Sequence, residues 1–467
     1  MRRAALAPAL AALAGLSAMS ACTTVGPDYE RPKMAPLPQY RFVSGAEQAA
    51  SLADLPWFQV FDDPNLQALV REAVTSNLDL RIAAARVDEL RARAGIVKSF
   101  LYPQVDGTAS YSVVGASSTP EGKDSTRQSG VFGFNLSWEW DLFGRIQRQH
   151  EAALATVLAS EQGRRGVLVT IVGDVASSYF LLRQLDAQLA IARETLRIND
   201  DTVTYFRNRL DGGVSNRLEL DRIMALRANT AASIPTFEQQ IAQVEDALSL
   251  LLGRAPGPIV RDQVSPLAVP PPAIPAGLPA SLLERRPDVL EAEQLLVAAN
   301  ADIGAAKALF YPSIGLTAFG GGVAGDVASL LSGSGAVWSL GAGLLQPIYN
   351  GGRNKRNYEA TQAQFQQALA AYQKAALNGY REVADSLITI QKLAEVRVHR
   401  EGGVTVLRDA SDLARSRYDS GLASYIEILT ADQDLFQQQL LLADTRGAEL
   451  RARAEFYRAL GGGWQQP

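Results

Sequence analysis

The sequence predicts a mixed α and β membrane protein built from an internally duplicated chain, with four transmembrane β-strands in two hairpins and long coiled helices. Three observations predict this fold class. A proline-free stretch with helical periodicity runs over 352–420. Landmark residues recur about 208 positions apart along the chain. Two pairs of stretches alternate between apolar and polar side chains, which is the period of a β-strand.

The proline-free stretch is predicted to be one long helix. A stripe of apolar residues steps by three or four from Phe365 to Ala394, which places these residues on one helix face. At 1.5 Å per residue such a helix would span roughly 100 Å. The stripe must therefore be buried against neighbouring helices, as in a coiled coil. Gly402 and Gly403 leave a bend or break open at that point.

The duplication rests on landmarks that keep their order. RNRLDGGVSNRLEL at 207–220 aligns with RSRYDSGLASYIEI at 415–428. The same offset of 208 relates Gly144-Arg145 to Gly352-Arg353 and Leu252-Gly253 to Leu460-Gly461. Tyr102-Pro103 and Tyr311-Pro312 differ by 209, which indicates a one-residue insertion or deletion. Ordered matches over this length indicate an internal repeat.

The start of the chain predicts export. Residues 1–21 form a signal peptide, in which Arg2 and Arg3 precede a short apolar run. Met19-Ser20-Ala21-Cys22 resembles a bacterial lipobox, so Cys22 is predicted to carry a covalent lipid. The alternative is an ordinary signal with an incidental cysteine. Thr23 after the cysteine favours transfer to the outer membrane, as in similar lipoproteins.

Composition excludes several classes of protein. The single cysteine rules out an intrachain disulfide and a cysteine-based metal site. The formal charge is −4, and loss of Arg2 and Arg3 leaves 43 basic against 49 acidic residues. This charge does not indicate the basic surface that a nucleic-acid-binding protein needs. Beyond the signal, no apolar run approaches the 20 or so residues of a transmembrane helix.

We divide the chain into a signal peptide (1–21), an extended lipid-anchored arm (22–62), a first repeat (63–256), a proline-rich connector (257–282) and a second repeat (283–467). The first repeat is predicted to contain helix 65–98, β-hairpin 102–141, long helix 145–211 and return helix 216–253, kinked at Pro235. The second contains a helix from 287 to 307, β-hairpin 311–346, long helix 352–420, return helix 424–460 and a C-terminal tail. Asp63 and Pro64 are expected to begin the first helix. By length, helices 65–98 and 216–253 could stack end to end beside 145–211.

The strands are predicted to be about ten residues long, the length of a tilted transmembrane strand. On one strand the expected lipid-facing set is Phe132, Phe134, Leu136, Trp138 and Trp140. A polar loop is expected over 115–130, and the third strand over 314–319. Four strands cannot close a barrel, and open edges cannot sit in lipid, so oligomerisation is required. Two copies would give eight strands with a filled interior, whereas three would give twelve and room for a water-filled lumen.

By these features the chain resembles TolC-like outer-membrane factors, specifically the NodT-type lipoprotein branch of tripartite, RND-type efflux systems. The resemblance covers residues 22–464. It is carried by C-x3-GPDY at Cys22–Tyr29, by the segment 286–321, by the Gly-Arg starts of both long helices and by the turns at Gly213 and Gly421. The resemblance implies a homotrimer with a twelve-stranded β-barrel in the outer membrane, continuous with a periplasmic α-helical barrel.

The implied function is a passive exit duct that carries drugs or other small toxic compounds. The implied partners are a periplasmic adaptor (membrane fusion) protein and an inner-membrane RND-type pump. A type I protein-secretion channel is the nearest alternative, although secretion-type relatives usually lack a lipobox. A non-conducting structural lipoprotein is a second alternative, against which the aromatic strand pairs argue.

The two turns between long and return helices are the candidate functional site. Ser424 with Glu427 matches an S-x-x-E capping box, and Asn216 with Glu219 matches it more loosely. Two helix hairpins without further function would also explain the glycines and caps. The resemblance implies that these turns form a gate and touch the adaptor. The full candidate set is Asp211, Gly213, Asn216, Glu219, Asp221, Arg222, Asp419, Gly421, Ser424, Glu427 and Thr430.

The gate is expected to depart from the family pattern. Thr430 and Gln433 stand where relatives often have Asp and Arg, so the ionic clamp of the family is expected to be built differently here. Asp221 with Arg222 is the candidate pair. Glu219, Asp221 and Glu427 are predicted to ring the mouth of the channel.

No catalytic, metal or cofactor site is predicted apart from the lipid on Cys22. Gly320, Gly322 and Gly325 match G-x-G-x-x-G, but no long helix or suitably spaced acidic residue follows, so an external hairpin loop is expected instead of a nucleotide site. His150 and His399 lie in separate charged helical stretches and do not make a metal site. Nothing pairs a nucleophile with a base, so an enzyme is not expected.

Overall fold

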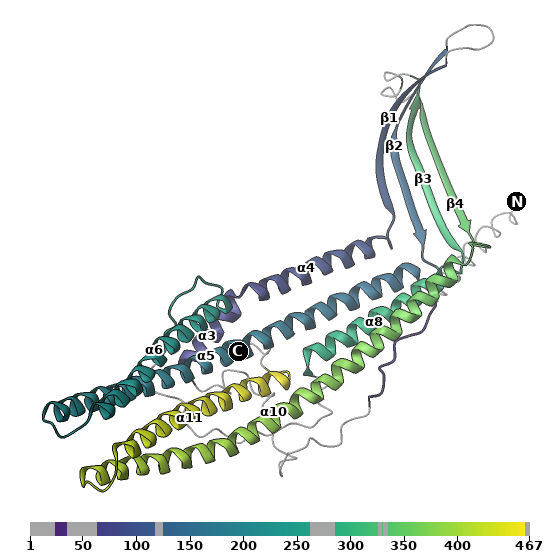
Figure 1. The fold of residues 1–467 in the computed structure, drawn as a ribbon. Helices are drawn as coiled ribbons and strands as arrows, with labels where there is room; N and C mark the ends of the chain where they lie inside the picture. Colours follow the sequence, from purple (N-terminus) through teal and green to yellow (C-terminus); the bar gives the residue numbers. More distant parts are fainter. Residues whose placement is uncertain are drawn as a thin grey trace, which may run out of the picture. The chain divides into compact units, whose positions relative to one another are not determined.

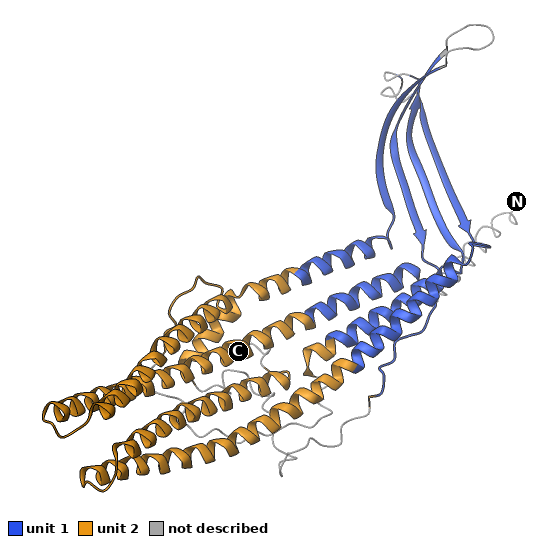
Figure 2. Ribbon diagram, in the orientation of Figure 1, with its two compact units in different colours: residues 1–33, 86–161, 291–373 blue, residues 34–85, 162–290, 374–467 orange. Residues whose placement is uncertain are grey.

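The computed structural model describes residues 24–34, 63–116, 125–261, 285–325, 329 and 335–462. Cys22 and residues 262–282 of the predicted connector lie outside these residues. The chain forms two compact units, coloured separately in Figure 2. Unit 1 comprises residues 1–33, 86–161 and 291–373, and unit 2 comprises residues 34–85, 162–290 and 374–467. Several long helices contribute one end to each unit.

Unit 1 carries a single antiparallel sheet of four strands in the order β1-β2-β3-β4 (Figure 1). The strands are β1 (Gln104–Ala116), β2 (Ser125–Trp140), β3 (Ser313–Ala324) and β4 (Ala336–Leu345). β2 pairs with β3 although a long helical segment separates them in the chain. Thus both hairpins belong to one sheet, and β1 and β4 are its outer strands.

The strand register gathers apolar side chains on one face of the sheet. Phe134 lies opposite Gly107 of β1 and Gly320 of β3, and residues directly opposite share a face. This face carries Val105, Gly107, Ala109, Tyr111 and Val113 of β1, Phe132, Phe134, Leu136, Trp138 and Trp140 of β2, Ile314, Leu316, Ala318, Gly320 and Gly322 of β3, and Ala336, Trp338, Leu340, Ala342 and Leu344 of β4. The other face holds most of the polar residues, including Asp106, Thr108, Ser110, Asn135, Ser137, Thr317 and Ser339.

Two strand predictions were wrong. The two strands of the first hairpin are longer than expected, because the predicted polar loop 115–130 contributes its ends to β1 and β2. Gly320 and Gly322 lie inside β3, not in an external loop. They face Phe134 and Phe132 on the neighbouring strand. A Cβ at Gly320 would meet no atom within 4 Å, whereas one at Gly321 would clash with the backbone of Phe132 and Gly133.

Trp138 also differs from expectation. It lies on the apolar face by register, but its indole N–H donates to the carbonyl oxygen of Leu101 at 3.0 Å. It stands two residues before β2 ends at Trp140. Trp138 is therefore near a strand end, so the middle of the apolar face is better represented by Phe134.

The extended segment 24–33 packs on unit 1. The backbone N–H of Val25 donates to the carbonyl oxygen of Phe143 at 3.2 Å, just after β2 ends. The buried Arg148 guanidinium pairs with Asp28, with 2.7 Å between Nη2 and Oδ1. These contacts hold the start of the arm at the junction between the sheet and the next helix.

The rest of the chain is mostly helical. The helices are α3 (Pro64–Ser76), α4 (Leu78–Ser99), α5 (Arg145–Asp211), α6 (Arg217–Leu251), α8 (Pro287–Ala308), α10 (Arg353–Asp419) and α11 (Tyr425–Ala459). Asp63 caps α3 by accepting from the N–H groups of Asn65 and Leu66. α10 continues through Gly402 and Gly403 as one helix, so the break left open there does not occur.

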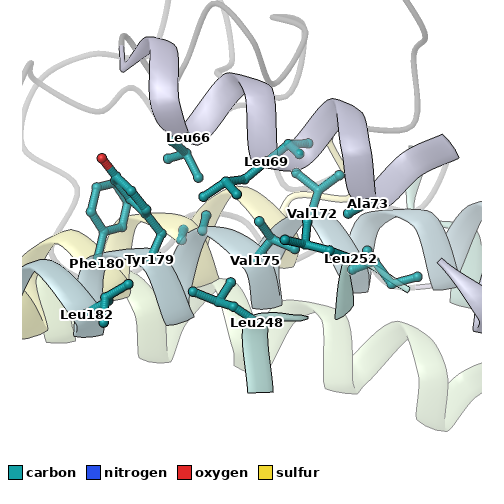
Figure 3. Close-up of a cluster of buried hydrophobic side chains, with 14 of the residues drawn as sticks. Leu66, Leu69, Ala73, Val172, Val175, Tyr179, Phe180, Leu182, Leu248 and Leu252 are labelled. Atoms are coloured by element: carbon teal, nitrogen blue, oxygen red, sulfur yellow. The ribbon is translucent and has the colours of Figure 1, made fainter. Parts of the chain in front are cut away.

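The largest core cluster lies in unit 2 (Figure 3). Leu66, Leu69 and Ala73 of α3 face the apolar side of α5, and Leu248 and Leu252 close the cluster. On α5 the cluster takes in Val172, Val175, Ala176, Tyr179 and Leu182, which recur at helical spacing. The Tyr179 hydroxyl donates to Asp63 at 2.8 Å, which satisfies its polar end inside the core.

The predicted helix 65–98 is in fact two helices, because the helix is interrupted at Asn77. Asn77 has extended backbone angles and caps α4 by accepting from the N–H groups of Asp79 and Leu80. Its side-chain amide donates to the carbonyl oxygen of Leu251 at 2.8 Å, at the end of α6. The end of α6 thus meets the start of α4, as the stacking predicted from helix lengths requires.

The second repeat forms the same joint with different chemistry. Arg286, which is 209 residues after Asn77, donates from Nη1 to the carbonyl oxygen of Ala459 at 2.7 Å. Arg286 is buried and also pairs with Asp288 and Glu382. The repeat is therefore visible in structure as well as in sequence, with a neutral amide at one joint and a paired cation at the other.

One stretch of α5 is long and apolar enough to cross a membrane by composition. Half of that stretch is buried within the protein. The same helix supplies part of the core cluster of Figure 3. Burial of this kind is what a core helix requires, so composition here does not imply a spanning helix.

Candidate functional site

The two turns of unit 2 end their helices in the same way. Gly213 has a positive φ of 72°, and its N–H donates to the carbonyl oxygen of Leu210 at 2.9 Å. The N–H of Val214 donates to the carbonyl oxygen of Arg209, also at 2.9 Å. These two bonds define a Schellman motif, in which glycine takes the left-handed position at no steric cost. The turn at Gly421 has the same φ and the same pair of bonds.

The first turn restarts its helix through Asn216. The Asn216 side chain accepts from the backbone N–H of Glu219 at 3.0 Å, which is an ordinary N-cap. The Glu219 carboxylate does not reach back to Asn216, because it accepts from the Ser215 hydroxyl at 2.5 Å. Of the two hydrogen bonds of a capping box, only the one accepted by the Asn216 side chain is therefore present.

The capping box predicted at the second turn is absent. Ser424 makes no side-chain cap bond at the start of α11. Glu427 instead lies 3.8 Å from Arg417, measured from Oε2 to Nε, at the end of α10. The competing cation explains why the carboxylate does not turn toward Ser424.

Each turn presents an exposed apolar pair. Val214 and Leu218 are 64% and 59% exposed, and their repeat counterparts Leu422 and Ile426 are 73% and 44% exposed. Val214 and Leu422 are 208 residues apart, as are Leu218 and Ile426, so the two pairs occupy the same positions in the two helix hairpins. Exposed apolar residues that recur at equivalent places indicate a contact surface.

An aromatic cluster with one cation joins the two hairpins above the turns. The centroid of the Phe206 ring lies 4.0 Å from that of the Tyr425 ring and 6.0 Å from that of the Tyr418 ring. The Arg209 guanidinium lies 5.6 Å from the centroids of both Tyr205 and Tyr418. α5 is thus tied to α10 and α11 by aromatic contacts and by cation–π attraction.

The surroundings fix the charge state of this cluster. The hydrogen bond that Arg209 donates to the Tyr205 hydroxyl raises the pKa of the Arg209 guanidinium. Burial raises the pKa of Tyr418 and of Tyr425, and the nearby Glu219 charge adds to both shifts. These shifts favour a charged Arg209 and uncharged Tyr418 and Tyr425 at neutral pH.

The comparisons with known proteins identify the family. The family model of outer membrane efflux proteins matches this chain twice, at residues 69–254 and 278–462. The chain belongs to the outer membrane efflux protein family. Because the model matches each half separately, the two repeats are both units of this family.

Whole-length relatives agree with the family match. The cation efflux system protein CusC of Escherichia coli O6:H1 is 36% identical over 453 residues, covering 96% of this chain and 97% of CusC. The probable outer membrane lipoprotein SilC of Salmonella typhimurium is 32% identical, covering 96% of each chain. A crystal structure of CusC superposes with a TM-score of 0.86 at 35% identity, covering 94% of this chain and all of that one.

Membership of the outer membrane efflux protein family makes this chain an outer-membrane component of an efflux system. The family forms channels and is not an enzyme family. Within the described residues no group of three or more His, Cys, Asp or Glu side chains could hold a metal ion. The candidate functional features of this efflux protein are its sheet and the tips of its two helix hairpins.

The ionic clamp at the tip of the efflux protein stays a prediction, but within one chain Asp221 has a partner other than Arg222. Asp221 lies 3.6 Å from Arg217, measured from Oδ2 to Nε. Arg222 is exposed, and no ion pair is shown for it among the described residues. Consecutive residues on a helix point in different directions, whereas residues four apart are neighbours.

The remaining predicted tip residues are spread over the surface. Asp211 and Asp419 are the exposed last residues of α5 and α10. Thr430 is exposed, and its hydroxyl donates to the carbonyl oxygen of Ile426. Burial raises the pKa of Tyr418 in the aromatic cluster, and the charge of the neighbouring Asp419 adds to that shift.

Sequence reasoning missed the cluster of Tyr205, Phe206, Arg209, Tyr418 and Tyr425. A signal was available, because Tyr205 and Arg209 are four residues apart and so share a helix face. Their partners come from the second repeat, more than 200 residues later. Helical spacing within one segment could not show which face meets which.

Proposed function

We propose that three copies of the chain close a twelve-stranded barrel and form the passive exit duct of an efflux pump. The observation that carries this proposal is the four-stranded sheet, apolar on one face, whose outer strands β1 and β4 each have one neighbour among the described strands. In lipid an open edge leaves backbone groups unsatisfied at a cost of several kcal/mol each. Two copies would give eight strands and a filled interior, whereas three give twelve and a lumen.

Native mass spectrometry of the protein extracted from membranes in mild detergent tests the stoichiometry. We expect a complex of three chains. A dimer would contradict the duct, because an eight-stranded barrel has no room for cargo.

We propose that the apolar face meets lipid and that the helices continue the duct into the periplasm as a helical barrel. Opposite the apolar face, the polar residues of the sheet would line the lumen, as in other outer-membrane barrels. The proline-rich connector would contribute to a girdle around the helical barrel. A passive duct has no energy source of its own, so transport must be driven by a partner protein.

We propose that Cys22 carries the lipid anchor. The arm is held at the end of the sheet by the bond from Val25 to Phe143. Cys22 precedes Thr24 by two residues, so its Cα can lie no more than about 7 Å from that of Thr24. A lipid on Cys22 would therefore enter the membrane close to where the strands end.

We expect mass spectrometry of the mature N-terminus to show a diacylglycerol thioether and an amide-linked acyl chain on Cys22. Cys22→Ser should lose both modifications and reduce sorting to the outer membrane, while any channels that do assemble conduct normally. An unmodified cysteine at the mature N-terminus would exclude the anchor.

The exposed apolar pairs at the two turns support an adaptor as the partner at the tips. Val214 with Leu218 and Leu422 with Ile426 give six equivalent patches in a trimer. A periplasmic adaptor that binds the open arrangement more tightly than the closed one would open the duct. An inner-membrane pump of the RND type would supply the energy and select the cargo, drugs or other small toxic compounds. CusC is named for cation efflux, which makes metal cations a further class to test.

The gate proposal places Glu219, Asp221 and Glu427 around the mouth of the duct. Nine carboxylates in a narrow opening would attract cations and repel anions. Within one chain Arg217 and Arg417 offset part of the charge of Asp221 and Glu427, and Glu219 accepts a hydrogen bond from the neutral Ser215 hydroxyl.

We expect Glu427→Gln to lower the cation-to-anion permeability ratio measured from reversal potentials in a planar bilayer. The matched control is Glu238→Gln, which removes an exposed carboxylate of α6 outside the turns. If the control lowers the ratio as much as Glu427→Gln does, the selective constriction is not at the turns.

A further inference from the structure

We infer that β4 of one copy pairs with β1 of the next copy in a single register, with Ser339 opposite Val114 and Leu340 opposite Val113. This inference rests on the closed barrel proposed above. It specifies the surface through which copies join, which neither the sheet of one chain nor its family membership gives directly.

The two hairpins have equivalent internal registers. Gln104 of β1 lies opposite Ser137 of β2, and Ser313 of β3 lies opposite Leu345 of β4. β3 therefore corresponds to β1 with an offset of 209, and β4 corresponds to β2 with an offset of 208. The one-residue difference between the repeats thus falls between the two strands of a hairpin.

The pairing of β2 with β3 joins the first hairpin to the second. A closed ring needs one more kind of joint, from the second hairpin of one copy to the first hairpin of the next. Both joints connect the second strand of one hairpin to the first strand of another. Internal duplication therefore makes the observed joint a template for the missing one.

Transferring the observed pairs gives the register. Val131 lies opposite Val323 and Phe132 opposite Gly322. Adding 208 on one strand and subtracting 209 on the other yields Ser339 opposite Val114 and Leu340 opposite Val113. The ladder then runs from Trp338 opposite Gly115 to Leu345 opposite Thr108, before Pro347, which has no N–H to donate.

The faces of the sheet agree with this register. Leu340 and Val113 both lie on the apolar face, and Ser339 and Val114 both lie on the other face. A shift by one residue would place apolar positions against polar ones along the whole edge. This agreement follows from the three observed registers, so the inferred joint continues both faces of the sheet.

Side-chain sizes separate this register from those shifted by two residues. Within the chain, Phe134 lies opposite Gly320 and Phe132 opposite Gly322. The inferred joint likewise sets large against small residues, with Trp338 opposite Gly115 and Tyr111 opposite Ala342. A shift of two in one direction would instead oppose Trp338 to Val113 and Leu340 to Tyr111.

Disulfide cross-linking in the outer membrane tests the register. The only native cysteine is Cys22, so no other native cysteine can form a disulfide with an introduced pair. The on-register pairs are Ser339→Cys with Val114→Cys on the polar face and Leu340→Cys with Val113→Cys on the apolar face. The off-register controls are Ser339→Cys with Ser112→Cys and Leu340→Cys with Tyr111→Cys, and each single variant is run beside them.

Opposite residues have Cβ atoms about 4.5–5.5 Å apart, whereas diagonal neighbours are about 7–8 Å apart. A disulfide needs about 3.5–4.5 Å between Cβ atoms. We expect mild oxidation to convert most of at least one on-register variant into dimers and covalent trimers on a non-reducing gel, while the off-register and single variants stay almost entirely monomeric.

Two outcomes are separable. If native mass spectrometry shows trimers but an off-register pair cross-links best, or no pair cross-links at all, the register is wrong and the barrel stands. If the unmodified protein is not a trimer, the proposed duct itself fails. Using one pair from each face guards against a cysteine that disturbs assembly at one position.

Discussion

Replacing Phe134 with arginine should nearly abolish assembly of the protein in the membrane. Phe134 lies on the apolar face near the middle of β2, opposite glycines on both neighbouring strands, and 59% of its surface is exposed in a single chain. An arginine on the lipid side near the bilayer midplane costs about 2–4 kcal/mol. Each 1.4 kcal/mol is a factor of about ten in an equilibrium constant, and three copies bear the change.

The matched control is Asn135→Arg, at the same depth on the opposite face. Asn135 would give up one exposed hydrogen bond, in which its amide donates to the Thr108 hydroxyl at 3.1 Å. We expect this variant to assemble at close to the normal level, because its side chain would enter water. The amount of folded protein in purified outer membranes measures both effects. Equal losses would mean that the sheet does not separate lipid from water as proposed.

Replacing Arg209 with alanine should make the channel open several times more often without the adaptor. Arg209 lies between Tyr205 and Tyr418 and donates to the Tyr205 hydroxyl at 2.9 Å. A cation–π contact at an exposed site contributes about 0.5–1 kcal/mol. If opening parts α5 from α10, only the contact with Tyr418 is lost on opening, because Tyr205 and Arg209 both lie on α5. Removing Arg209 then shifts the balance by about 0.5–1 kcal/mol, or roughly two- to fivefold in open probability.

Arg197→Ala is the matched control. Arg197 is an exposed arginine of α5 that pairs with Glu194 and Asp201 on its own helix. Its loss removes the same charge from the same helix without touching a second hairpin. Open probability in single-channel recordings should rise for Arg209→Ala and stay at the unmodified level for Arg197→Ala. The same rise in both would point to net charge instead of the aromatic cluster.

Much of the fold could be predicted because its elements carry strong periodic signals. The apolar stripe of α10 and the alternation of β2 are properties of single segments, and the repeat is a comparison of segments within one sequence. The break at Asn77 was not predictable in this way. It depends on the bond from the Asn77 amide to Leu251, a residue 174 positions away.

The tip residues show the same limit. The glycine turns were predictable because Gly213 and Gly421 supply a backbone conformation that few other residues adopt. The ionic partners of Asp221 and Glu427 were not, because several arginines lie within reach and three-dimensional packing decides between them. The aromatic cluster was missed for the related reason that its rings come from three helices in two repeats.

Single-channel recording of the purified protein in a planar bilayer is the most direct test of the central claim, that this member of the outer membrane efflux protein family is a passive duct. We expect discrete, cation-selective current steps that require no nucleotide or ion gradient beyond the applied voltage. Arg209→Ala should increase the time spent open. A folded trimer, verified by native mass spectrometry in the same preparation, that passes no current in either the unmodified or the Arg209→Ala form would contradict the duct.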